Sequence, residues 1–296
     1  MSNRTATRLG FGAILLWSTL GLLTAIAGPL PPFQMVALTF SVSAVMGLIG
    51  IISPGPWGRS MHKYPLKLWG LGLWGLFGYH FFYFLALGHA PAVEANLINY
   101  LWPLLIVLFS GLLPNEHLSR WSIIGVVLGF IGAASVVVTA EGSLSNEAAG
   151  FGYFMAVMAA LAWSSYSVLS RHFAHIGSDA VAGFCLLTAI SAWACHISME
   201  TWVAPSLTQY AALTSLGLGP VGLAFFLWDR GMKRGDIQLL GTLSYLTPLL
   251  STLLLISFGH GQWRSSLLMA ALLIVSGAFL ASKKSTERTP PTLKTP

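Results

Sequence analysis

Ten hydrophobic segments, joined by short polar connections, constrain this chain more than any other feature of its sequence. They cover residues 9–27, 33–53, 66–88, 92–113, 121–139, 151–171, 180–198, 210–228, 237–257 and 264–282. Most of them have the roughly 20 residues that a helix needs to cross the hydrocarbon core of a bilayer. Only 8% of the residues are charged and 55% are hydrophobic, which is far from the composition of a soluble domain. We therefore predict an all-α integral membrane protein with ten transmembrane helices.

The basic residues are placed asymmetrically around these segments. Of the 15 Lys and Arg residues, all but Arg264 lie before the first segment, after the last one, or in every second connection between them. Because cytoplasmic loops carry an excess of Lys and Arg, we predict that both termini are cytoplasmic. The same distribution explains the net charge of +6 without a nucleic-acid partner, since no basic stripe or soluble domain is present to hold one.

A faint repeat divides the chain into two halves. Leu16–Thr19 recurs as Ala162–Ser165 after 146 residues, and Tyr100–Leu105 recurs as Tyr245–Leu250 after 145 residues. Each half then holds five helices, and because five is odd the second half enters the membrane from the opposite side. In such an inverted repeat a substrate site is expected near the midplane, between the halves. The predicted units are residues 1–140 and 150–284, followed by a cytoplasmic tail at 285–296 that is expected to be disordered.

An alternative for the first segment is a cleaved signal peptide. Arg4 and Arg8, the apolar run 9–24 and the small-residue motif Ala25–Ala27 are typical of one, and cleavage would leave nine helices. The repeat, however, requires this segment as the counterpart of the sixth. We therefore expect it to be retained.

Several short motifs make the chain resemble a known family. They are Trp17-Ser18 and Trp163-Ser164, Ala86-Leu87 followed by Ala90–Leu97, the stretch Asn96–Pro103, and Glu116 beyond the fourth segment. Together they resemble the drug/metabolite transporter superfamily of the ten-helix EamA type, over residues 8–284, and within it the exporters of aromatic amino acids. In the second half the pattern departs from the family, because Gly261 stands where Glu116 would recur. This favours a local role for Glu116 at a cytoplasmic helix end.

Polar residues inside the fourth segment indicate a site within the membrane. Asn96, Asn99, Tyr100 and Pro103 share one helix face by their spacing. Carboxamides within a span cost free energy unless they are paired or wetted. Pro103, and Pro248 at the equivalent place in the ninth segment, each remove a backbone hydrogen bond, and we predict that both act as hinges or gates. The alternative for these residues is ordinary hydrogen bonding between helices and a kink.

Aromatic residues near the centres of other segments are expected to complete this site. Tyrosine and tryptophan rings offer a stacking wall with one polar group each, although plain packing or a belt at the membrane interface is the alternative reading. His80 is the only ionisable residue clearly inside a span, and it can bind substrate, relay protons or merely donate a hydrogen bond. Gly72, Gly75 and Gly78 beside it are expected to let a neighbouring helix approach closely. The predicted substrate-binding residues are Trp17, Tyr79, His80, Tyr83, Asn96, Asn99, Tyr100, Trp102, Trp163, Tyr166, Ser244 and Tyr245.

No motif for catalysis, a metal or a cofactor stands out. The remaining histidines lack the spacing of metal ligands, and no phosphate-binding loop or nucleophile elbow is present. Cys185 and Cys195 lie ten residues apart on one expected helix, too far apart to form a disulfide. We predict a protein that is not an enzyme and has neither a metal site nor a cofactor.

The resemblance implies a monomeric transporter of the bacterial inner membrane, surrounded by lipids, that exports amino acids, including aromatic ones, by alternating access through a central cavity. The alternative is an efflux carrier for lipophilic or dicationic drugs. The four-helix drug carriers of the superfamily rely on a glutamate in their first helix, and the first segment here holds no acid, which favours zwitterions. With His80 as the sole central titrating group, we expect transport down the gradient of the substrate or by exchange.

Overall fold

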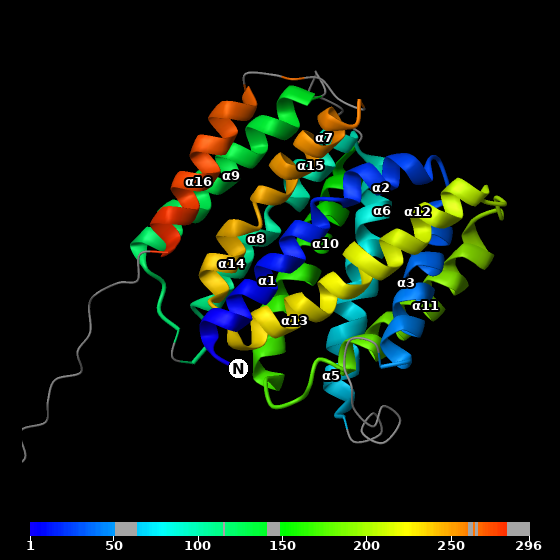
Figure 1. Cartoon of the computed structure of the whole chain (residues 1–296), viewed down its shortest axis with the longest axis horizontal. Coiled ribbons are helices and arrows are strands. Elements are labelled where there is room, and N and C mark those ends of the chain that lie inside the picture. Colours follow the sequence, from blue (N-terminus) through cyan, green and yellow to red (C-terminus); the bar gives the residue numbers. More distant parts are fainter. Residues whose placement is uncertain (51–63, 115, 141–148, 260–262, 264–265, 283–296) are drawn as a thin grey trace, which may run out of the picture.

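The computed structural model describes residues 1–50, 64–114, 116–140, 149–259, 263 and 266–282, and within them it contains helices and no strands. The bundle is shown in Figure 1. Its first-half helices are α1 (Asn3–Trp17), α2 (Leu20–Ala27), α3 (Pro32–Leu48), α5 (Leu66–Leu73), η2 (Trp74–Gly78), α6 (Tyr79–His89), α7 (Ala92–Asn99), α8 (Trp102–Ser110) and α9 (Arg120–Ala140). The second half comprises α10 (Gly150–Leu169), η4 (Ser170–Phe173), α11 (Ala180–Met199), α12 (Leu207–Leu218), η5 (Gly219–Leu223), α13 (Ala224–Arg234), α14 (Ile237–Leu243), α15 (Leu246–Ser257) and α16 (Ser266–Ser282). The predicted tail at 285–296 lies outside the described residues.

Several of these helices are long and apolar enough to cross a membrane. Among the described residues there are 6 such spans: Asn3–Ala27, Leu66–His89, Gly150–Phe173, Ala180–Met199, Leu207–Arg234 and Ile237–Ser257. Shorter apolar helices cover Pro32–Leu48, Glu94–Ser110, Arg120–Ser135 and Leu267–Ala281. The chain is therefore a multi-pass, all-helical membrane protein, whereas the number of ten crossings remains a prediction.

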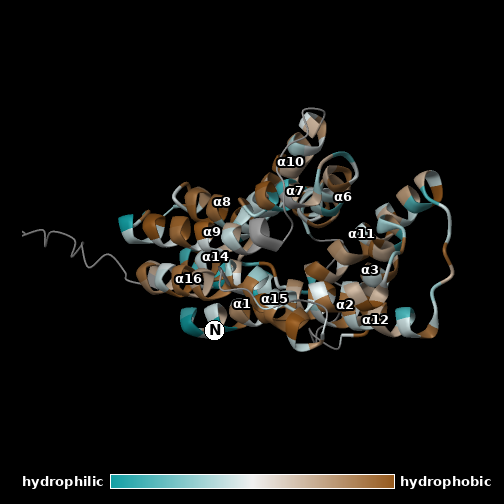
Figure 2. Cartoon of the chain, turned by 90° about the horizontal axis from the view of Figure 1, so that it is seen from above, coloured by the Kyte–Doolittle hydropathy of each residue, from teal (hydrophilic) through white to brown (hydrophobic). Residues whose placement is uncertain are grey.

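The outer faces of α9 and α16 show how the bundle meets lipid. Figure 2 shows that hydrophobic residues cover much of both helices, which lie side by side. On α9 the exposed side chains include Ile124, Val127 and Ile131, which follow one another at helical spacing. On α16 they include Leu268 and Leu272. Such a surface is stable in hydrocarbon and would be a liability in water.

Three spans are interrupted near their middle. The first breaks at Ser18 and Thr19, whose hydroxyls donate to backbone carbonyls 4 and 3 residues earlier. These side-chain hydrogen bonds compete with the backbone hydrogen bonds of the regular helix and bend it. The other two breaks lie at residues 100–101 and 244–245, shortly before Pro103 and Pro248. Because neither proline can donate a backbone hydrogen bond, the helix cannot run on unbroken through these positions.

The succession of elements recurs after about 145 residues. The π-helical turns η2 and η5 begin at Trp74 and Gly219, which are 145 positions apart, and each is followed by a helix of 11 residues. Pairs of equivalent helices also pack together: α3 packs against α11, and α9 against α16. In the same way the contact of α1 with α13 is matched by that of α10 with α6. The two halves therefore share an order of elements as well as two short motifs.

The glycines expected to allow close helix packing do so at two of three positions. A Cβ atom on Gly72 would lie 2.2 Å from the ring of Phe184 on α11, and one on Gly75 would lie 2.2 Å from Tyr166 on α10. At Gly78 the nearest atom would be 3.6 Å away, so this glycine is not required for packing. The π-helical turn explains the difference, because it shifts Gly78 off the face that Gly72 and Gly75 share.

Charged residues gather where α10, α13 and the N-terminus meet, at what we call the charged end, defined by Glu116, Arg171, Asp229, Lys233 and Arg234. The side chain of Asn3 donates to the carbonyl of Arg234, which places the N-terminus here as well (Figure 1).

At the opposite end, the Glu200 carboxylate accepts hydrogen bonds from the first backbone N–H groups of α3. A carboxylate is favourable at a helix N-terminus, so Glu200 ties α11 to α3.

Candidate functional site

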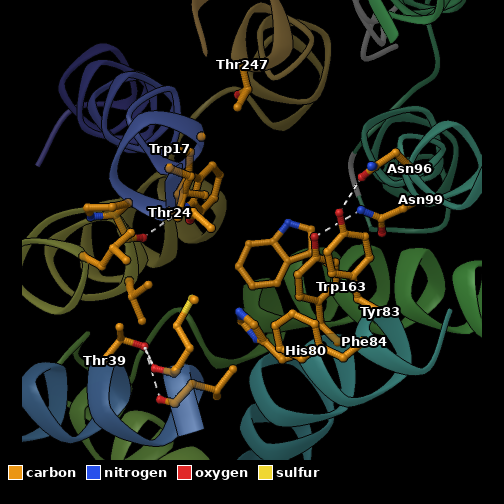
Figure 3. A pocket seen from close by; sticks show the side chains of 18 of the residues that line it. Trp17, Thr24, Thr39, His80, Tyr83, Phe84, Asn96, Asn99, Trp163 and Thr247 are labelled. Carbon is orange, nitrogen blue, oxygen red and sulfur yellow. Dashed lines mark hydrogen bonds between the residues drawn. The ribbon is translucent and has the colours of Figure 1, made fainter. Parts of the chain in front are cut away.

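A cavity of about 490 Å³ lies between the two halves. In Figure 3, Trp17, Thr24 and Thr39 lie on one side, and His80, Tyr83 and Asn99 on the other. The lining residues belong to the parts of the membrane-spanning helices that lie farther from the charged end. The lining residues are Trp17, Leu20, Gly21, Thr24, Met35, Val36, Thr39, Tyr79, His80, Tyr83, Phe84, Leu87, Asn96, Asn99, Tyr100, Trp102, Trp163, Leu216, Pro220, Val221, Phe225, Thr247 and Ser251.

Carboxamides and phenols form the polar wall of the cavity. The hydroxyl of Tyr83 donates to Oδ1 of Asn96, and Nδ2 of Asn99 donates to the Tyr79 hydroxyl over 3.1 Å (Figure 3). The helix break after Asn99 places these side chains at the end of α7, beside the rings of α6. Oδ1 of Asn99 and the hydroxyl of Thr247 are buried and have no hydrogen-bond partner among the described residues. Each can therefore accept a hydrogen bond from a bound molecule.

His80 adds a further acceptor to this wall. Its Nδ1–H donates to the carbonyl of Leu76 over 2.7 Å, one helical turn earlier. The ring lies edge-on to Phe40 and Tyr79, with centroids 5.1 Å away in both cases. In the neutral ring this bond fixes the tautomer, so Nε2 keeps its lone pair.

Four tryptophans close the cavity toward the charged end. The centroid of Trp17 lies 5.5 Å from that of Trp163, 6.3 Å from that of Trp102 and 4.9 Å from that of Trp228. The indole N–H of Trp17 donates to the carbonyl of Pro220, and that of Trp228 to the hydroxyl of Ser167. Since all four rings are buried, this tryptophan floor separates the cavity from the charged end.

An ion pair ties helix ends together below this floor. Arg171 contacts Glu116 through Nη1 at 2.5 Å and donates through Nη2 to the carbonyl of Gly235 at 2.5 Å. Glu116 thus forms a local ion pair in the connection between α8 and α9. This agrees with the local role expected from the absence of a second glutamate at position 261. Nearby, the hydroxyl of Tyr64 donates to Asp179, and burial together with this carboxylate raises the pKa of the phenol.

Nine of the twelve predicted site residues line the cavity. They are Trp17, Tyr79, His80, Tyr83, Asn96, Asn99, Tyr100, Trp102 and Trp163. Whether they bind substrate remains a prediction.

The other three predicted residues, and both prolines, lie outside the lining. Tyr166 packs beneath Gly75, and Tyr245 fills a separate core, where it contacts Gly129. The hydroxyl of Ser244 donates to the carbonyl of Leu240, within its own helix turn. These positions lie closer to the charged end than the cavity does, and their role in binding stays a prediction. Pro103 and Pro248 are buried beside the helix breaks.

Sequence reasoning missed polar residues of two kinds. Thr24, Thr39 and Thr247 line the cavity, yet a threonine in an apolar helix carries no signal of its own. Asp229 and Lys233 form a buried ion pair of 2.9 Å on α13. The eighth predicted segment ended at residue 228, so this pair was assigned to a loop, although opposite charges four residues apart are typical of a helix.

A membrane bundle with a cavity between two similar halves is typical of a transporter, and the comparison with known families agrees. The EamA-like transporter family matches residues 5–138 and again residues 150–283. The chain belongs to this family, which confirms the resemblance seen in its motifs and the prediction that it is not an enzyme.

Among similar proteins are exporters of aromatic amino acids. The chain is 48% identical to the aromatic amino acid exporter YddG of Ancylobacter novellus over 290 residues, covering 95% of this chain and 98% of the relative. It is 30% identical to the protein of that name from Escherichia coli, covering 95% and 97% of the two chains. A solved crystal structure with 46% identity superposes with a TM-score of 0.90, covering 95% of this chain and 98% of the other.

Proposed function

We propose that this protein exports amino acids, including aromatic ones, across the bacterial inner membrane. The observation that carries the proposal is the cavity, whose walls are aromatic rings, carboxamides and hydroxyls. None of the described lining residues is Asp, Glu, Lys or Arg. The names of the similar exporters support the same substrate class.

The cavity wall suits both parts of an aromatic amino acid. An aromatic side chain can pack edge-to-face against Trp163 and Tyr79, as Trp163 already does with Trp102 and Tyr79 with His80. The ammonium group can donate to Oδ1 of Asn99 and to Nε2 of His80, which are otherwise free acceptors. A zwitterion has no net charge, so it needs no buried counter-ion in this cavity.

Transport by alternating access would use the two halves as an inverted repeat of ten crossings. The recurrence of π-helical turns and helix breaks after about 145 residues, and the matched pairing of helices, support this arrangement. With the charged end in the cytoplasm, as the distribution of Lys and Arg favours, the cavity lies on the outer side of the tryptophan floor. The structure then corresponds to the outward-facing state, held closed toward the cytoplasm by Arg171 and Glu116.

The test is counterflow in liposomes that contain the purified protein. Vesicles loaded with unlabelled phenylalanine should accumulate labelled phenylalanine transiently, whereas vesicles without protein should not. A second set loaded with the dication methyl viologen examines the drug-carrier alternative, which a lining without carboxylates does not favour. Exchange of the dication without exchange of phenylalanine would overturn the proposal.

A further inference from the structure

The inference that follows rests on the proposed alternation between two inverted halves. In such a transporter, residues that line the cavity open to one side have counterparts in the other half that line the cavity open to the opposite side. A shift of 145 residues takes Asn99 to Ser244 and Tyr100 to Tyr245. These two counterparts are predicted site residues that the observed cavity does not reach. They therefore mark where a cytoplasm-facing cavity would form.

The same shift takes the cavity residue Phe84 to Asp229. The two halves differ in charge at this position, because an apolar ring in one half corresponds to a carboxylate in the other. Asp229 lies on α13 next to Trp228 of the tryptophan floor, on the side of the charged end. A cavity formed there would be acidic, unlike the observed one.

Asp229 is buried, and only one of its two oxygens is used. Oδ2 accepts a hydrogen bond from Ser178 over 2.6 Å and from Lys233 over 2.9 Å. Oδ1 is buried and has no partner among the described residues, although only 1% of the residue is exposed. An unsatisfied buried acceptor on a charged group is unfavourable, because it has lost its hydrogen bonds to water without gaining others. Such a group points to a partner that is present in another state.

A second free polar group lies close by on α10. The hydroxyl of Tyr166 is buried without a partner among the described residues, and the hydrogen bond from Trp228 to Ser167 joins the residues next to Asp229 and Tyr166 across α13 and α10. A carboxylate oxygen and a phenol oxygen together offer two acceptors to one donor-rich cation. An ammonium group, with three N–H donors, matches this pair.

We infer that the cytoplasm-facing state has its own substrate site, in which Oδ1 of Asp229 and the hydroxyl of Tyr166 accept hydrogen bonds from the ammonium group of the amino acid. In the observed state Lys233 neutralises the carboxylate while the site is closed. Loading from the cytoplasm then uses a hydrogen bond between two ionised groups, the ammonium and the carboxylate. In the outward-facing cavity the ammonium meets only neutral acceptors, so the amino acid is held less tightly where it is released.

The first part of the test asks whether this second cavity exists. Ser244→Cys serves as the reporter in a background with Cys185→Ala and Cys195→Ala, in inside-out vesicles treated with a membrane-impermeant thiol reagent. The expected result is labelling that saturating phenylalanine or phenethylamine suppresses, whereas 3-phenylpropionate, which lacks the ammonium group, does not. Ala133→Cys, which is buried between α9 and α16, is the control and should stay unlabelled.

The second part removes the carboxylate. Asp229→Asn alone leaves Lys233 buried and unpaired, so the double variant Asp229→Asn/Lys233→Met is compared as well, because it leaves no buried charge. The phenylalanine concentration that half-protects the reporter should rise about tenfold or more, as expected when the ionised acceptor of the ammonium is replaced by a neutral one. An unchanged half-protecting concentration would mean that the Asp229–Lys233 pair only holds the fold together.

The outcomes separate this inference from the proposed function. A reporter that is never labelled, in a protein whose unsubstituted form exchanges phenylalanine in counterflow, overturns the cytoplasm-facing site and leaves export intact. Failure of the unsubstituted protein to exchange phenylalanine overturns the proposed function itself.

Discussion

Trp163 connects more of the cavity than any other single ring at the site. Its centroid lies 5.5 Å from that of Trp17, 5.8 Å from that of Tyr79 and 5.6 Å from that of Phe225, so helices of both halves meet on it. A substrate ring that enters the cavity would replace part of this aromatic contact with its own.

We expect Trp163→Ala to weaken phenylalanine binding by about 1 kcal/mol or more, which is roughly a fivefold rise in the half-saturating concentration. The measurement is counterflow at matched protein levels. Trp263→Ala is the control, because Trp263 is 59% exposed and is not among the residues that line the cavity. Equal effects of the two substitutions would contradict a binding role for Trp163.

At the same scale, the sequence predicted much of the site because helical spacing assigns residues to faces. Tyr79, Tyr83, Asn96 and Asn99 fell on one wall for this reason. Tyr166 lies outside the observed cavity because periodicity fixes the face of a helix but not which end of the bundle is open. That property depends on the state of the whole protein.

At the scale of elements, the close packing of α10 against η2 depends on Gly75. Gly75 lies against Cβ and Cγ of Tyr166, atoms that cannot move away without moving the backbone of α10. We expect Gly75→Ala to lower the free energy of unfolding by about 1–3 kcal/mol, the usual cost of overpacking. Thermal unfolding in detergent measures the change.

The matched control for this substitution is Gly70→Ala, which lies in the same span, Leu66–His89. No atom lies within 4 Å of a Cβ added at Gly70, so alanine should leave stability unchanged or raise it by about 0.5–1 kcal/mol through its helix propensity. A stabilising effect at Gly75 as well would show that the two helices are less closely packed than described.

The helix break before Pro103 makes a second prediction at this scale. Pro103→Ala restores a backbone N–H that can bond to the carbonyl of Asn99, so the helix should straighten and exchange should slow several-fold without loss of folded protein. Pro32→Ala is the control, because Pro32 is the first residue of α3, where the missing N–H has no partner to lose. Equal exchange rates in both variants would argue against a hinge at Pro103.

The broad fold could be predicted because hydrophobic segments report membrane spans directly. Their interruptions could not all be predicted, since the break at Ser18 involves no proline and depends on hydroxyls that bond to their own helix. The π-helical turns η2 and η5 carried no signal that the periodicity of the apolar residues could reveal.

At the scale of the whole molecule, the placement of charge makes a prediction about orientation. The Lys and Arg residues favour a cytoplasmic position for both termini. A fluorescent protein fused to the C-terminus should therefore fluoresce, and alkaline phosphatase fused at the same place should be inactive. The reverse pattern would exclude both the orientation and the outward-facing assignment.

The absence of charged side chains from the described lining also decides how the transporter responds to voltage. The cavity carries no formal charge, and Asp229 and Lys233 cancel, so a zwitterion crosses the membrane without moving net charge. A cation would instead work against about 2.3 kcal/mol per 100 mV when leaving a cell that is negative inside. We expect phenylalanine exchange in liposomes to keep the same rate when a potassium gradient and valinomycin impose a potential of either sign. Such a carrier can relieve an excess of amino acids even while the cell maintains its full electrical gradient, and without drawing on it.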